Sequence, residues 1–216
     1  MPTVALFLVF LLAGFLNAAF AQNCALSGTP AWSKQLRNVI ADCDNQFTSP
    51  NGKLLLRIDT EGEIRISEVA SGNQLQIHSR AVEPPAMVSW SPSSDAFFIN
   101  DGEGSGMSST FRLFRVKESQ VVEDGATERK SVALYRSRTR CDSASADPNV
   151  WGIGWSPDGG RFHLLVQATV NVPCGKPGSF ISMTVKLADG SVLKQLSEAA
   201  TKREFQALLP REVYSN

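Results

Sequence analysis

The sequence Trp155-Ser156-Pro157-Asp158-Gly159 indicates a repeated fold, because similar phrases occur earlier as Phe47-Thr48-Ser49-Pro50-Asn51-Gly52 and Trp90-Ser91-Pro92-Ser93-Ser94. Each phrase separates two short apolar runs. Proline presets φ for the first central position of a turn, aspartate or asparagine suits the next position, and glycine accepts a positive φ. Each phrase therefore predicts a hairpin turn, and the chain is expected to repeat a unit of antiparallel strands.

The spacing of the three phrases indicates the size of this unit. Ser49 and Ser91 lie roughly 42 residues apart, and the interval to Ser156 is longer because it contains the insert 125–149. Each unit contains about four short apolar strands. A period of roughly 40 residues with four strands is typical of propeller blades, which stack to bury both faces of each sheet. Alternating apolar residues over Phe111–Val116 favour such burial on both faces.

The repeated phrase, followed by an apolar strand and then by a strand that ends in Asp-Gly or Ser-Gly, resembles the TolB-like family of beta-propeller repeats of exported bacterial proteins. The resemblance covers Cys43 to about Leu196. It departs from the family pattern at Ser93-Ser94, which replaces Asp-Gly, and in showing three copies where rings usually hold four to eight. It implies an all-β partial beta-propeller of about three four-stranded antiparallel blades, and it says little about activity.

The N-terminal segment predicts export. Val4–Leu16 is almost purely apolar, and Ala19-Phe20-Ala21 has the small-x-small pattern of a signal peptidase site. We expect a signal peptide at 1–21, a single domain at 22–216, and a periplasmic or secreted protein with no other membrane association. The absence of lysine and arginine at the start leaves an uncleaved anchor as the alternative, and polar residues before Cys24 argue against a lipoprotein.

Charge and cysteine content restrict the function further. With 21 basic and 21 acidic residues the chain is electrically balanced, so nucleic acid is not an expected partner. In an exported chain, Cys24, Cys43, Cys141 and Cys174 are read as two disulfides, and zinc is disfavoured because no Cys-x-x-Cys pair occurs. In the propeller that the resemblance implies, Cys141 and Cys174 lie in loops on one face and can pair, which leaves Cys24 with Cys43.

Two helices are expected besides the strands. Thr127–Tyr135 predicts a short helix in the insert, although the alternation of Arg136, Arg138 and Arg140 leaves a strand as the alternative. Near the end, Thr201 and Glu204 form a capping box before an apolar stripe, which predicts a helix that Pro210 stops. Both helices are expected to cover blade ends or edges that would otherwise be exposed. The stripe consists of Phe205, Leu208 and Leu209.

Asp101, Glu103 and Ser105 resemble the opening of a calcium-binding loop. The twelfth position should supply a bidentate carboxylate, but it is Arg112, so a surface loop is favoured and no metal or cofactor is predicted. The three alternating arginines would suit an anionic ligand, although a solvated charge run is the preferred interpretation.

No catalytic arrangement is evident. His78 and His163 fall in expected strands, where a packed and hydrogen-bonded histidine is favoured over a general base, and no Gly-x-Ser-x-Gly elbow occurs. Trp90 and Trp155 occupy matching repeat positions and are expected in the core.

The sequence therefore favours a non-catalytic binding or scaffold module of unknown ligand. The alternatives are a small secreted hydrolase and a small-molecule or metal-binding protein that uses the loops of the cysteine-bearing face. Such a module could bind a protein partner or associate with itself. A monomeric partial propeller is preferred over a six-bladed dimer, because the two helices offer covers for the ends.

Overall fold

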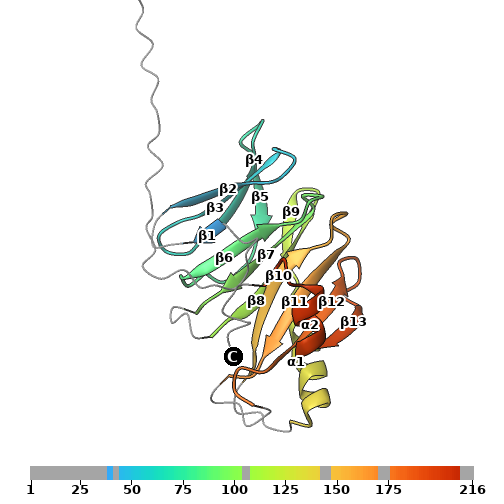
Figure 1. Ribbon diagram of the computed structural model, residues 1–216. Helices are drawn as coiled ribbons and strands as arrows, with labels where there is room; N and C mark the ends of the chain where they lie inside the picture. The colour runs from blue at the N-terminus through green and yellow to red at the C-terminus, as the bar shows by residue number, and fades with distance from the viewer. Residues whose placement is uncertain (1–37, 41–43, 104–107, 142–146, 170–175, 210–216) are drawn as a thin grey trace, which may run out of the picture.

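The computed structural model describes residues 38–40, 44–103, 108–141, 147–169 and 176–209. These parts contain thirteen strands and two helices (Figure 1). The predicted signal peptide at 1–21 lies outside them. Within the described residues, no helix is long and apolar enough to cross a membrane.

Three units of four consecutive strands form antiparallel meanders, as the repeated phrase predicted. The first unit consists of β2 (Asn45–Thr48), β3 (Leu54–Ile58), β4 (Ile64–Glu68) and β5 (Gln74–Ile77). The second unit consists of β6 (Ala86–Trp90), β7 (Ala96–Asp101), β8 (Thr110–Lys117) and β9 (Gln120–Glu123). The third unit consists of β10 (Asn149–Trp155), β11 (Arg161–Gln167), β12 (Phe180–Lys186) and β13 (Val192–Ser197). A short strand, β1 (Asn38–Ile40), adds to the free edge of β6.

The serine of each repeated phrase closes its hairpin turn. The hydroxyl oxygen accepts a hydrogen bond from the amide five residues later, at 3.0 Å for Ser49, 3.2 Å for Ser91 and 3.0 Å for Ser156. This bond satisfies a backbone donor that would otherwise be unpaired where the chain turns. The turn chemistry therefore requires the serine as well as the proline and glycine.

The three turns also contact one another, which explains why Ser93-Ser94 stands where the third turn has Asp158-Gly159. Ser94 takes the left-handed conformation, with φ of 64°, that glycine takes in the other two turns. Its hydroxyl accepts a hydrogen bond of 3.1 Å from the amide of Asn51 in the first turn. In the third turn a Cβ on Gly159 would lie 2.5 Å from the Ser93 hydroxyl oxygen, so only glycine fits there.

The prediction of three separate four-stranded sheets is wrong for the first two units. β5 pairs in parallel with β9, through Gln76 opposite Gln120 and Ile77 opposite Val121. The result is one curled nine-stranded sheet in the order β1-β6-β7-β8-β9-β5-β4-β3-β2, beside a separate sheet β10-β11-β12-β13. Backbone hydrogen bonding thus joins the outer strands of the first two units, which the prediction had left as separate edges.

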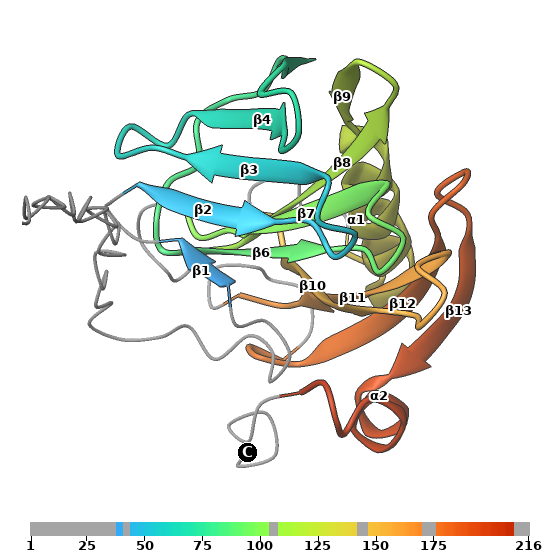
Figure 2. The same cartoon turned by 90° about the horizontal axis from the view of Figure 1, so that it is seen from above.

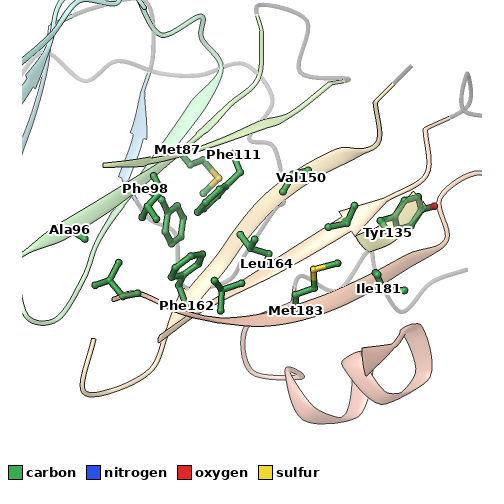
Figure 3. Close-up of a cluster of buried hydrophobic side chains, with 14 of the residues drawn as sticks. Met87, Ala96, Phe98, Phe111, Tyr135, Val150, Phe162, Leu164, Ile181 and Met183 are labelled. Carbon is green, nitrogen blue, oxygen red and sulfur yellow. The ribbon is translucent and has the colours of Figure 1, made fainter. Parts of the chain in front are cut away.

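Apolar side chains fill the spaces between successive units. Figure 2 shows the first unit lying over the second, the third unit on the far side of the second, and α2 (Glu198–Glu204) beyond the third. One cluster lies inside the curl of the large sheet, with Leu56, Phe97 and Phe114 at its centre. A second cluster lies between β6–β8 and the third unit, where Phe98 and Phe111 point toward Phe162 (Figure 3). The expected burial of both faces is thus confirmed for the second unit.

The exposed side of the first unit differs from that expectation. Its β3 and β4 strands alternate between buried and exposed or half-buried positions, so one face is solvated. The exposed face carries polar side chains of Gln46, Arg57, Arg65, Gln74 and Gln76. This end of the stack is therefore polar and needs no cover.

The insert forms α1 (Gly125–Thr139), so the helix prediction is confirmed and the strand alternative for the arginines is wrong. Asp124 caps the helix by accepting hydrogen bonds from the amides of Ala126 and Thr127. Tyr135 is buried in the cluster between the second and third units. The helix therefore closes one side of that interface. The sequence led us to expect that it would cover an end of the stack, and that expectation is wrong.

The terminal helix α2 begins earlier than the capping box predicted. Ser197 is its N-cap, whereas Thr201 is buried inside the helix and hydrogen-bonds to Ser182 at 2.8 Å. The apolar residues after the helix do pack on the outer face of the third unit, so the predicted cover is confirmed there. These residues are Phe205, Leu208 and Leu209.

Candidate ligand-binding cleft

A cleft of about 790 Å³ lies between α1, the start of β8 and the start of β10. Glu128, Val132 and Arg136 line it from α1, at positions one and two helical turns apart. Thr110 and Asp147 line the opposite side. Three segments distant in the sequence thus converge on one concave surface, which is the usual setting of a small-molecule site.

The floor of the cleft is held by direct bonds between the second and third units. The carbonyl of Ser109 accepts a backbone hydrogen bond of 2.9 Å from the amide of Val150 in β10. The Ser109 amide donates to the side-chain oxygen of Asn149 at 3.0 Å. Ser109, Asn149 and Val150 are all buried. The floor is therefore preorganised by the fold.

Glu128 is the central ionisable group of the cleft. Its Oε1 accepts a 2.9 Å hydrogen bond from the amide of Phe111. That amide needs a side-chain partner, because β9 pairs with β8 only from Phe114 to Lys117 and does not reach Phe111. Glu128 thus takes the place of a missing strand neighbour, and its carboxylate is fixed at the cleft wall.

The surroundings of Glu128 favour its protonated form. The pKa of the Glu128 carboxyl is raised to about 7, chiefly by burial and with smaller contributions from the neighbouring carboxylates of Glu103 and Asp147. The Phe111 amide and the Arg80 guanidinium act in the opposite direction. A carboxyl group that titrates near neutral pH in a cleft is a recognised mark of a functional site.

Three other charged groups around the cleft, Glu103, Arg136 and Asp147, have partners of opposite sign. The guanidinium of Arg136 lies 2.6 Å from the carboxylate of Asp147. Glu103 accepts a hydrogen bond from the Thr110 hydroxyl, and its carboxylate lies 3.9 Å from Arg80. Among the described residues, Glu128 has no ion pair.

The predicted calcium loop is used in another way. Asp101 is fully buried, and its carboxylate lies 3.1 Å from Arg112 and 3.4 Å from Arg80. Arg112, the residue that replaces the expected twelfth ligand, is therefore the partner of the first one. Glu103 reaches the cleft, whereas Ser105 lies outside the described residues. In the described part of the chain, no three His, Cys, Asp or Glu side chains are placed to hold a metal ion.

The cysteine predictions fall mostly outside the described residues. Cys141 directly follows Arg140, the C-cap of α1, and carries no free thiol. Cys24, Cys43 and Cys174 lie in undescribed segments, so the pairing stays a prediction.

Of the two histidines, His163 lies in a strand and is packed as expected, whereas His78 is not. His163 is half-buried, its Nδ1 lies 3.1 Å from the Thr184 hydroxyl, and its ring lies 4.6 Å from that of Phe205. Burial lowers the pKa of His163. His78 is exposed directly after β5, and its Nε2 lies 3.1 Å from the side-chain amide nitrogen of Gln76, so the packing expected for this histidine is wrong. Trp90 is buried inside the curl as predicted, whereas Trp155 is half-buried and packs against the second cluster.

Sequence reasoning missed Glu128, although it noticed Glu103 and Arg136 on either side of it. The available signal was weak, namely an acidic residue in the first turn of a predicted helix, which usually complements the helix dipole. The role of Glu128 depends on β9 ending before it reaches Phe111, and this pairing is set by the tertiary structure. No protein-family model matches the chain, and no curated protein matches its sequence.

Proposed function

We propose that this chain is a non-catalytic binding module whose ligand enters the cleft between α1 and the starts of β8 and β10. The carrying observation is the convergence of Glu128, Glu103 and Arg136 on a cleft with a fixed floor. Binding is favoured over hydrolysis because neither described histidine hydrogen-bonds a carboxylate, as a general base in a triad would. The cleft supports the ligand-binding alternative more strongly than a pure scaffold.

The proposal also covers the relationship of the three units to beta-propeller blades. We regard the three units as a partial, TolB-like propeller whose first two blades have merged through β5 and β9, in an exported, periplasmic or secreted protein. The stacked turns and the apolar clusters between units support this relationship. The polar outer face of the first unit and the α2 cover on the third favour a monomer over a dimeric six-bladed ring. Light scattering tests the monomer, and a dimer would contradict it.

A ligand screen tests the proposed function. We expect at least one compound from a chemically diverse metabolite panel to raise the melting temperature in a concentration-dependent way. The amide resonance of Phe111, which is bonded to Glu128, should move on titration with that compound. A panel in which every stabilising compound leaves this resonance unmoved would refute the cleft as the binding site.

A further inference from the structure

The cleft is chemically asymmetric along α1. Glu128 lies in the first turn of the helix, Val132 and Ala133 follow one turn later, and Arg136 lies one turn beyond them. Residues four apart face the same side of a helix, about 6 Å from one another. The cleft wall therefore runs from a carboxyl group, over a short apolar strip, to an ion pair between Arg136 and Asp147.

The carboxyl end is the part whose bonding is incomplete. An ionised carboxylate can accept about four hydrogen bonds, and Glu128 accepts one, from Phe111, among the described residues. The carboxylate of Glu103 is close enough to act on Glu128 electrostatically. A positively charged donor between them would satisfy both groups.

We propose that the cleft takes a small organic ammonium compound, whose N–H groups donate to Glu128 and Glu103 while its short hydrocarbon chain lies on Val132 and Ala133. This inference rests on the proposed function and names its ligand class. The ammonium group replaces a missing ion pair, and charge-assisted hydrogen bonds of this kind are about twice as strong as neutral ones. The apolar strip adds hydrophobic contact that a bare inorganic cation would not use.

Other ligand charges fit less well. An anion would approach two carboxylates, while the nearby guanidinium groups of Arg80 and Arg136 already lie against Asp101 and Asp147. Arg129, on the cleft wall, is exposed to solvent, where its charge is screened. Calcium needs six to eight oxygen ligands, and the described residues offer no cluster of three ligating side chains.

Proton release couples to this binding. The compound pairs with the ionised form of Glu128, which is the minor form below pH 7 because the pKa of this carboxyl is about 7. By linkage, affinity should be about 30-fold weaker at pH 5.5 than at pH 8. The groups that set this dependence are Glu103, Asp147 and Arg80, with Arg129 and Arg136 on α1 itself.

Pentylamine is a suitable probe, with pentanoate and pentan-1-ol as matched anionic and neutral controls. At pH 8 we expect pentylamine to move the Phe111 amide resonance saturably, and the two controls to leave it in place. Glu128→Gln should weaken this binding at least tenfold, since glutamine keeps the bond to Phe111 but carries no charge. Glu61→Gln, at an exposed turn position, should bind as the natural chain does.

Equal binding of pentanoate, or undiminished binding by a folded Glu128→Gln variant, would overturn the ammonium proposal. An absence of any saturable shift with pentylamine would overturn it as well. The proposed function fails separately, only when no compound of the diverse panel moves the Phe111 resonance. The two conclusions can therefore be told apart in one set of titrations.

Discussion

Replacing Arg112 by methionine should be among the most destabilising single changes in this protein. The side chain is 2 % exposed and makes five hydrogen bonds. They reach the carboxylates of Asp101 and Glu123 and the backbone carbonyls of Arg80 and Ala81. These bonds tie β8 to β7, to β9 and to the segment between β5 and β6.

The magnitude follows from what the substitution leaves behind. Methionine fills much of the volume, so the main cost is a buried Asp101 carboxylate and two carbonyls without their donor. Breaking a buried pair in this way costs about 3 to 5 kcal/mol. Arg80, at 3.4 Å from Asp101, compensates in part, so we expect a loss of about 4 kcal/mol in the free energy of unfolding.

Urea unfolding of the natural chain and two variants measures this effect. Arg65→Met is the matched control, because Arg65 is 53 % exposed and pairs with Asp59 and Glu63 at the surface. Such pairs contribute about 0.2 to 1 kcal/mol, so the control should lose less than about 1 kcal/mol. A similar small loss for Arg112→Met would refute the view that this arginine holds β8 to β7, to β9 and to the segment between β5 and β6.

Three further changes have defined outcomes. Gly152→Ala places a Cβ 2.5 Å from the Phe98 ring, so the free energy of unfolding in urea should fall by about 1 to 3 kcal/mol. An unchanged unfolding midpoint would contradict the close approach of β10 to β7. Because the pKa of Glu128 is raised in the folded state, its contribution to stability is present below its unfolded pKa and is lost as pH rises to about 7. Between pH 5 and 8 the natural chain should therefore lose stability relative to Glu128→Gln, by at most about 3 kcal/mol in pH-dependent melting. Parallel curves for the two proteins would contradict this. The pKa of His163 is lowered in the folded state, so its effect on stability is the reverse, and the natural chain should lose stability as pH falls below about 6.5. His163→Gln should lose less stability over the same pH range, and equal losses would contradict this.

Local turn chemistry made most of the fold predictable. The phrase around Ser49, Ser91 and Ser156 specifies a tight turn by itself, and its repetition implies matching strands on either side. The α1 helix and the apolar cover after α2 follow from patterns within one short segment. All of these depend on residues close together in the chain.

The remaining features depend on long-range contacts. The pairing of Gln76 with Gln120 has no local signal, because either β5 or β9 could have remained an edge. Thr201 fits a capping box by sequence, but its burial against Ser182 places the helix start at Ser197. Asp101 resembled a metal ligand until Arg112 was placed beside it.

The parallel bond between β5 and β9 also determines how modular the protein is. In stacked repeats each unit contacts its neighbours through side chains, so units can be deleted or duplicated with modest loss. Here the backbone amides of β5 depend on β9, which the ribosome synthesises only after most of the second unit. A nascent chain that stops before Gln120 would present an open strand edge, and such edges favour aggregation. The first two units therefore share one hydrogen-bonded sheet, and deleting either of them would leave an unpaired strand edge on the other.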